Sequence, residues 1–262
     1  MAGRLALRVA AFAYLAAILA LPVGMIFYRS FDHGIIAAWH AVTQPDALHA
    51  LWLTLLIAAI AVPMNTVFGV LCALLLVRSK FRFARVIDVL VDLPFAVSPV
   101  VVGLALVLLY GRQGWFGPWL AAHDIRVIFA LPGMVLATVF VSLPFVVREV
   151  VPLLREIGDD QEQAARTLGA SPWQSFWRVT LPSIRWGVTY GVVLTTARAI
   201  GEFGAVSVVA GHLAGVTQTL TLYVDDRFEA FDLTGAYVAS VVLALLAFAT
   251  LFSMNALARK EA

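Results

Sequence analysis

The chain has 262 residues, of which 62% are hydrophobic and 13% charged, and its mean hydropathy is +0.92. This is more apolar surface than the core of one soluble domain can bury, so a lipid bilayer is the expected environment. The net charge of +2 is too small to indicate a nucleic-acid partner. The single cysteine, Cys72, excludes an intrachain disulfide.

Six long apolar stretches follow one another along the chain, each with the roughly 20 residues that cross about 30 Å of hydrocarbon. They predict an all-α polytopic membrane protein in which residues 1–262 form one domain, with spans at about 8–28, 49–77, 87–111, 127–148, 184–211 and 234–258. The first stretch follows Arg4 and Arg8 but is longer than the apolar part of a secretion signal. We therefore interpret it as an uncleaved span.

The distribution of basic residues predicts the direction of the spans, because cytoplasmic loops retain Lys and Arg. If both termini are cytoplasmic, thirteen of the eighteen Lys and Arg residues lie on the cytoplasmic side, Arg148 among them, and four on the outer side. The remaining one, Arg198, lies within the fifth span. We expect a multi-pass protein of a bacterial cytoplasmic membrane with both termini inside.

The sequence contains no motif that indicates nucleotide binding, metal binding or catalysis. The two lysines, Lys80 and Lys260, are not in a G-x-x-x-x-G-K-[ST] phosphate loop. The five histidines lie in or beside outer loops, without an H-E-x-x-H motif or a Cys and His cluster. We expect no catalytic residue, no metal ligand and no cofactor bound by this chain.

The loop between the fourth and fifth spans, about residues 149–183, is the one sizeable polar segment. Asp160 with Gln163 has capping-box spacing and predicts a first short helix, whose stripe is Gln161, Ala164, Ala165 and Leu168 and whose left-handed stop is Gly169. Ser171, Pro172 and Gln174 predict the start of a second, which Leu181 and Pro182 would end. Helices this short are marginal alone and need a docking surface, either the bundle itself or a cytoplasmic partner.

The loop resembles the EAA loop of permease subunits of ATP-binding-cassette importers, written E-A-A-x3-G-x9-I-x-L-P. The resemblance rests on residues 163–169, which read QAARTLG, and on residues 179–182, which read VTLP. Gln163 stands where that family has Glu, and Glu162 lies one position earlier. The resemblance implies a short coupling helix that enters a cleft of an ATPase subunit; the matching positions, with Glu162 added, are Glu162, Gln163, Ala164, Ala165, Leu168, Gly169, Leu181 and Pro182.

Four further segments resemble the sulfate/thiosulfate permeases of the CysW type, over roughly residues 45–255. They are residues 91–102 (VDLPFAVSPVVV), 145–149 (FVVRE), 168–174 (LGASPWQ) and 197–209 (ARAIGEFGAVSVV). Molybdate permeases share a looser form of the last segment. The resemblance implies a type I importer fold and membrane-lipid surroundings. The implied partners are a second permease subunit (CysT- or CysU-like), two ATPase subunits (CysA-like) that bind ATP and Mg, and an extracytoplasmic sulfate-binding protein.

A charged pair lies inside the fifth predicted span. Arg198 and Glu202 have i, i+4 spacing, and an unpaired charge at that depth costs about 2.5–3.5 kcal/mol on insertion scales, so both should face the bundle interior. The pair is either a structural ion pair, helped by the close-packing Gly187, Gly191, Gly201 and Gly204, or part of an anion path to which Arg198 lends positive potential. Ser98 and Ser142 are further candidates for that path.

The expected function is inward movement of sulfate or thiosulfate by alternating access, driven by the partner ATPase subunits. A molybdate or tungstate permease is the first alternative, and an ion channel or a non-transporting membrane scaffold is an alternative of another class. Co-purification with an ATPase separates that class from an importer.

Overall fold

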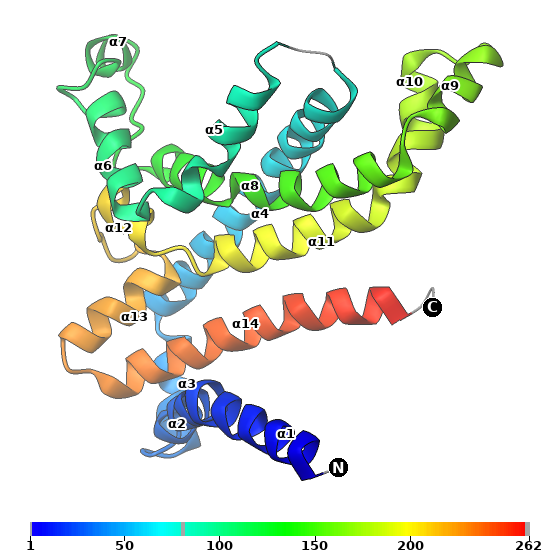
Figure 1. Ribbon diagram of the computed structural model, residues 1–262. Helices are drawn as coiled ribbons and strands as arrows, with labels where there is room; N and C mark the ends of the chain where they lie inside the picture. The colour runs from blue at the N-terminus through cyan, green and yellow to red at the C-terminus, as the bar shows by residue number, and fades with distance from the viewer. Residues whose placement is uncertain (1, 80–81, 260–262) are drawn as a thin grey trace.

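The computed structural model describes residues 2–79 and 82–259, and regular structure in these two ranges is helical (Figure 1). Four helical segments are long and apolar enough to cross a membrane. The first is Leu7–Ser30, which covers most of α1 (Ala2–Leu15), the π-helix η1 (Ala16–Ala20) and α2 (Leu21–Ser30). The others are α4 (Pro45–Arg78), α8 (Leu131–Ile157) and Leu233–Ser253, within α14 (Leu233–Arg259).

Two bent helix pairs bring the number of candidate crossings to as many as six. The pair α5 (Ala84–Ala96) and α6 (Pro99–Tyr110) is bent by 111°. The second pair joins residues 172–200 to α12 (Gly204–Ala210) and is bent by 52°. The predicted spans over 87–111 and 184–211 are therefore not single helices. At the first break, Ser98 precedes a proline and is extended, with φ −59° and ψ 135°.

The loop between α8 and the fifth span contains α9 (Asp160–Thr167) and α10 (Pro172–Ser175). A π-helix, η2 (Phe176–Thr180), joins α10 to α11 (Leu181–Ile200). Figure 1 shows α9 and α10 at the end of the bundle where α1 begins and α14 ends. The short helices α7 (Gly117–Ala122) and α13 (Leu220–Glu229) lie at the opposite end, and α3 (Ile35–Thr43) connects α2 with α4.

The core forms around α8, which packs against α4 and α11 at very short range. Val146 of α8 lies between Gly69 of α4 and Gly191 of α11. A Cβ atom added to Gly69 would lie 2.7 Å from the Cβ of Val146, and one added to Gly191 would lie 2.8 Å from its Cα. Glycine at these two positions therefore lets the three backbones approach closely. Close packing stabilises helix association in a membrane, where no hydrophobic driving force brings helices together.

The prediction that four glycines of the fifth span pack closely is confirmed for three of them and wrong for Gly201. A Cβ on Gly187 would lie 2.9 Å from the carbonyl oxygen of Glu149, and one on Gly204 would lie 3.0 Å from Pro99, so both are close-packing positions. Gly201 is exposed and meets only the carbonyl of Ala197 in its own helix, at 3.6 Å. The prediction for Gly201 is wrong because the fifth span breaks there instead of continuing along its neighbour.

A buried hydrogen-bond network also links α4 to α8. The amide nitrogen of Asn65 donates to the carbonyl of Val139 at 3.0 Å and to the hydroxyl of Ser142 at 2.8 Å. The Ser142 hydroxyl in turn donates to the carbonyl of Thr138 at 2.5 Å. Polar groups buried among apolar helices are costly unless they are paired, so this network fixes the relative position of the two helices.

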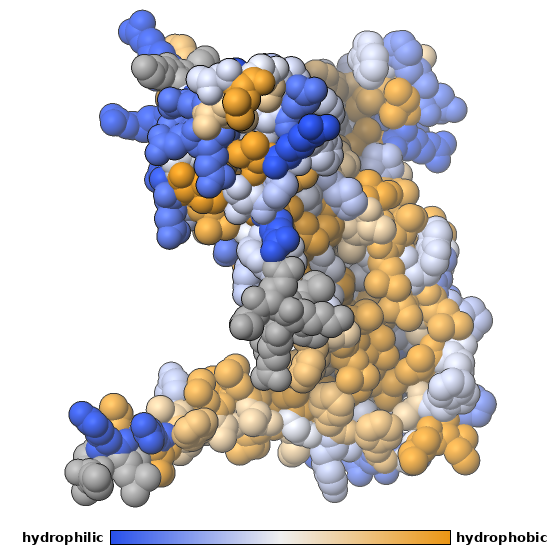
Figure 2. All heavy atoms as spheres, turned by 90° about the vertical axis from the view of Figure 1, so that its right-hand side faces the viewer, coloured by the Kyte–Doolittle hydropathy of each residue, from blue (hydrophilic) through white to orange (hydrophobic). Residues whose placement is uncertain are grey.

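Figure 2 views the end of the molecule that carries α9 and α10. Hydrophilic residues gather in the upper part of this view and hydrophobic residues cover much of the lower part. The first span is the least covered of the long helices, since none of its most apolar window is buried within the chain. Its side chains, such as Phe12 and Leu19, are available to lipid or to another subunit.

Candidate functional site

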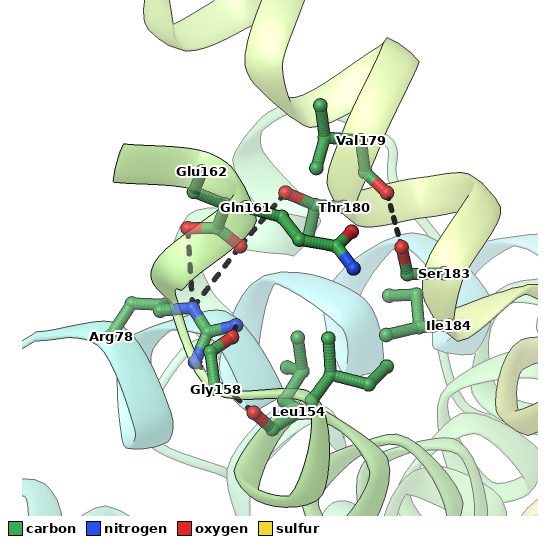
Figure 3. Close-up of a pocket in the computed structure, with 10 residues that line it drawn as sticks. Arg78, Leu154, Gly158, Gln161, Glu162, Val179, Thr180, Ser183 and Ile184 are labelled. Carbon is green, nitrogen blue, oxygen red and sulfur yellow. Dashed lines mark hydrogen bonds and ion pairs between the residues drawn. The ribbon is translucent and has the colours of Figure 1, made fainter. Parts of the chain in front are cut away.

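The loop helix α9 is attached to the bundle through one acidic side chain. Glu162 is a buried residue of α9, and both of its carboxylate oxygens lie 3.2 Å from the Nε of Arg78 (Figure 3). The hydroxyl of Thr180 donates to the Oε1 of Glu162 at 2.9 Å. Because hydrogen bonds to a charged group are the stronger ones, this carboxylate holds an eight-residue helix that is marginal alone.

Arg78, the last residue of α4, organises the other side of this contact. Its Nη1 donates to the carbonyl of Leu154 at 3.1 Å, and its Nη2 donates to the carbonyl of Gly158 at 2.5 Å (Figure 3). Both carbonyls belong to the end of α8, where orphan acceptors are exposed by the helix terminus. One guanidinium thus joins the ends of α4 and α8 to α9, and we call Arg78, Glu162 and Thr180 the loop clamp.

Thr180 brings a third long helix into the clamp. It is the last residue of η2, which runs without interruption from α10 into α11. The predicted end of the second short helix at Leu181 and Pro182 is therefore wrong, because the chain stays helical through both residues. Pro182 lacks the N–H that would bond residue 178, and the preceding turn is wound as a π-helix with Leu181 N–H bonded to the carbonyl of Phe176.

The starts and stops of the two loop helices follow the sequence only in part. Asp159, not Asp160, precedes α9, and its side chain makes no capping hydrogen bond, so the predicted box of Asp160 and Gln163 does not form. The second box does form: Ser171 Oγ accepts from Gln174 N at 3.3 Å, and Gln174 Oε1 accepts from Ser171 N at 2.9 Å. Gly169 has φ +84° and is the left-handed stop that the sequence predicts.

The predicted stripe of α9 faces outward. Gln161, Ala164 and Leu168 are exposed, Leu168 by 89%, and Ala165 is half-buried. Gln163 is also exposed, so the residue in the family's Glu position makes no buried contact, and Glu162 makes it instead. Most of α9 is thus exposed in this chain, while Glu162 is docked against the bundle.

Arg198 and Glu202 form the expected ion pair, but at a helix end instead of along a continuous helix. The Nη1 of Arg198 lies 2.6 Å from the Oε2 of Glu202, whose side chain is 2% exposed, whereas that of Arg198 is 30% exposed. The other oxygen, Oε1, accepts from the N–H of Ala205 at 2.9 Å. Glu202 therefore ends one helix and begins the next, because its carboxylate bonds a free N–H in the first turn of α12.

The break at Glu202 is held by a second contact. The hydroxyl of Thr221 in α13 donates to the carbonyl of Glu202 at 2.8 Å, so this carbonyl is satisfied outside any helix. A small cavity of about 10 Å³ adjoins Glu202 and is lined by Thr54, Thr138 and Thr219 together with four apolar residues, Ile57, Ala199, Ile200 and Val206. The carbonyl of Glu202 in the unwound segment thus has a hydrogen-bond partner, as non-helical chain at membrane depth requires.

The two serines proposed for an anion path lie in different surroundings. Ser98 is exposed at the bend between α5 and α6. Ser142 is fully buried, and its hydroxyl both donates to Thr138 and accepts from Asn65. Ser142 is therefore not available to a passing anion in this conformation, because helix packing already uses its hydroxyl.

Sequence reasoning missed several polar residues of the site. Arg78 and Thr180 each bond Glu162 from another part of the sequence, so no local pattern predicts their contacts. Arg148 is counted among the cytoplasmic residues and ends the predicted span 127–148, but it lies inside α8, with Asp88 and Asp92 of α5 as partners. A signal existed for this last group, since acidic residues four positions apart in an apolar helix require a cation nearby.

The fold and the loop clamp together define a polytopic helical membrane protein whose polar loop is docked on the ends of three long helices. Residues 65–262 match the family described as "Binding-protein-dependent transport system inner membrane component". The chain is 52% identical over 238 residues to the sulfate transport system permease protein CysW of Synechocystis sp., covering 91% of this chain and 86% of that one. Identity to CysW of Escherichia coli K12 is 50% over 235 residues, covering 90% and 81%.

Solved structures agree on the fold. A bacterial ABC transporter involved in alginate import matches with a TM-score of 0.82 at 16% identity, covering 98% of this chain and 94% of that one. The MetNI methionine ABC transporter matches with a TM-score of 0.60 at 18% identity, covering 81% and 94%. The chain belongs to the family of binding-protein-dependent transport system inner membrane components. It is a multi-pass transport subunit and not an enzyme.

Proposed function

We propose that this chain is the transmembrane subunit of an ATP-binding-cassette importer that moves sulfate or thiosulfate inward. The observation that carries the proposal is the orientation of α9, whose Glu162 is clamped to the bundle while Leu168 is 89% exposed at its far end. A short helix that is fixed to the bundle through one side chain and leaves its other residues exposed is suited to dock another protein. The sulfate assignment is supported by relatives at 50–52% identity that are sulfate transport permeases.

The importer would contain further subunits. We infer a second permease chain of the CysT type, two CysA-like ATPase subunits that bind ATP and Mg, and an extracytoplasmic sulfate-binding protein. The CysT permease of Escherichia coli K12 is 41% identical over 241 residues, which supports pairing between two similar chains. Figure 1 shows α9 and α10 at the same end as the start of α1 and the end of α14, and the basic residues of the loop support a cytoplasmic position for this end.

The loop clamp gives the ATPase a mechanical connection to three long helices. Closure of the ATPase subunits would displace α9 together with Ala164, Ala165 and Gly169. Arg78 then transmits the displacement to α4 and to the end of α8, and Thr180 transmits it to α11. Because these three helices pack closely around Val146, they would tilt as one unit.

External energy is required for this transport. Moving a divalent anion inward against an inside-negative potential of about 100 mV costs roughly 4.6 kcal/mol, at about 2.3 kcal/mol per charge. Within the pathway we assign the positive potential to Arg198, which is partly exposed, and the position of the helix break to Glu202, which is buried. Ser98 at the α5–α6 bend is the remaining polar candidate.

The test is uptake by cells that lack their own oxyanion importers and express this chain with its partner subunits. Labelled sulfate, thiosulfate and molybdate are supplied separately, and uptake is compared with that of cells whose ATPase subunit cannot hydrolyse ATP. ATP-dependent uptake of sulfate or thiosulfate is expected. Uptake of molybdate alone would transfer the assignment to molybdate, and ion flux without the ATPase subunits would indicate a channel.

A further inference from the structure

A cavity much larger than the one beside Glu202 lies at the end of the bundle opposite the loop clamp, where α14 packs against α13 and α2. It has a volume of about 360 Å³ and is open to the surface of the chain. Sites for small molecules typically have volumes of about 300–1,000 Å³. Its lining includes no residue of the loop clamp and neither Arg198 nor Glu202, so it is a separate feature of the chain.

One carboxylate and three aromatic residues line this cavity. Asp225 of α13 contributes the carboxylate and is half-buried. The aromatic residues are Phe203, Phe228 and Tyr237. A carboxylate attracts a cation directly, and aromatic rings attract it through their electron-rich faces. The lining therefore favours a positively charged ligand and disfavours an anion.

The carboxylate of Asp225 is available to such a ligand. Among the residues that the structure describes, none forms a hydrogen bond or an ion pair with it. Arg227 of α13 is paired with other acids, since its Nη2 lies 3.8 Å from Oδ2 of Asp46 and its Nη1 lies 3.7 Å from Oδ2 of Asp232. Arg29 of α2 is paired, at 3.1 Å, with an aspartate three residues later. The described helices around the cavity therefore supply no cation to Asp225.

The cavity lies at the depth where a bilayer changes from headgroups to acyl chains. α14 has 27 residues and is therefore about 40 Å long, which matches a bilayer with its headgroup regions. Tyr237 lies roughly 6 Å from the start of α14, at headgroup depth, and Leu243 lies roughly 15 Å from it, among acyl chains. Ile26 adds an apolar side chain from the first span, whose most apolar window is not buried within the chain. Polar groups at headgroup depth are thus joined to an apolar wall that reaches into the hydrocarbon.

We propose that this cavity binds the ammonium headgroup of phosphatidylethanolamine from the surrounding bilayer, with the ammonium at Asp225 and the acyl chains along Ile26 and Leu243. The headgroup supplies the cation that Asp225 lacks, and the acyl chains cover apolar side chains that are only partly buried. Phosphatidylglycerol has no cation and carries a net negative charge, so Asp225 disfavours it. Binding of the lipid is independent of which anion the importer carries.

A lipid in this cavity would contact residues that hold the helix break. Phe203 directly follows Glu202 in the chain and lines the cavity. Thr221 lines it as well, and its hydroxyl donates to the carbonyl of Glu202 at 2.8 Å. The lipid would therefore stabilise the junction between α11 and α12 from the side that faces α13.

The test counts the lipids bound to the complete importer by native mass spectrometry. Detergent-solubilised importer is mixed with equal amounts of phosphatidylethanolamine and phosphatidylglycerol that have the same acyl chains. Asp225→Asn removes the charge at nearly constant size, and Phe228→Leu replaces a ring with an apolar side chain. Glu229→Gln is the matched control, because Glu229 is an exposed acid of the same helix that does not line the cavity.

We expect the unaltered importer to retain phosphatidylethanolamine over phosphatidylglycerol by roughly tenfold, the effect of one charge-assisted contact. Asp225→Asn should lose most of this preference and Phe228→Leu a smaller part of it, whereas Glu229→Gln should keep it. Glycerophosphoethanolamine, which has the same headgroup without acyl chains, should not displace the lipid at equal concentration.

Four results would overturn the proposal. An unaltered importer without any preference would mean that the second permease chain fills the cavity. A preference that Asp225→Asn retains would place the lipid elsewhere, and one that Glu229→Gln loses equally would attribute it to net charge. Displacement by glycerophosphoethanolamine would mean that the cavity binds a headgroup alone and not a lipid. If Asp225→Asn fails to assemble, Phe228→Leu decides by the same comparison, and an unchanged preference in that variant refutes the site.

Discussion

Removal of the Glu162 carboxylate is the most direct test of the loop clamp. In Glu162→Ala, Arg78 loses its charged partner and retains only the carbonyls of Leu154 and Gly158, and Thr180 loses its acceptor. The two charged side chains are 11% and 20% exposed, so solvent screens the pair weakly. Breaking a buried pair costs about 3–5 kcal/mol, and the two remaining carbonyls favour the lower end of that range.

A loss of about 3 kcal/mol lowers the ratio of docked to undocked α9 by roughly a hundredfold, since about 1.4 kcal/mol corresponds to a factor of ten. We therefore expect Glu162→Ala to insert normally, to hydrolyse ATP and to import far less anion per ATP. The measurement is the number of anions imported per ATP in reconstituted importer. Hydrogen exchange of the α9 amides should accelerate in parallel.

Two further variants sharpen this test. Glu162→Gln retains an acceptor for Thr180 and should give an intermediate loss, because the charge alone is removed. Gln163→Ala changes the exposed neighbour and should behave as the unaltered chain. Unchanged coupling and unchanged exchange in Glu162→Ala would refute the clamp as the route by which motion reaches α4.

Three other predictions concern separate parts of the chain. Arg198→Gln should reduce anion uptake at least tenfold at normal surface expression, because it replaces a partly exposed cation with a neutral amide. Unchanged uptake would mean that Arg198 and Glu202 form a structural ion pair only. Gly191→Val should lower the free energy of unfolding of the detergent-solubilised protein by about 1–3 kcal/mol, because the new Cβ would lie 2.8 Å from the Cα of Val146. A variant as stable as the unaltered chain would contradict this packing. Gly169→Val should impair the coupling of ATP hydrolysis to transport, because a Val at φ +84° carries backbone strain of about 1–2 kcal/mol. Gly169→Asn should impair coupling less, because Asn tolerates the left-handed region of backbone conformation. Equal effects of the two variants on the number of anions imported per ATP would argue against strain as the cause.

The membrane class, the long apolar spans and the polar loop are predictable from the sequence because each depends on residues that are neighbours in the chain. Apolar length indicates a span, Ser171 with Gln174 indicates a helix start, and Gly169 indicates a left-handed stop. The same local rules misplace the start of α9 and the end of the second loop helix. At those positions Glu162 and Thr180 bond each other, and tertiary contacts decide the winding of the chain.

What the sequence by itself determines is that this chain enters a membrane, turns back repeatedly and presents a motif-bearing loop, since hydropathy and turn chemistry act over a few residues. What only the tertiary structure decides is which charge meets which. Arg78 meets Glu162 across 84 positions, and Arg148 meets Asp92 across 56. Inside apolar surroundings a charge is stable only beside its partner, and the packing of the helices, which no local pattern records, decides which partner it meets.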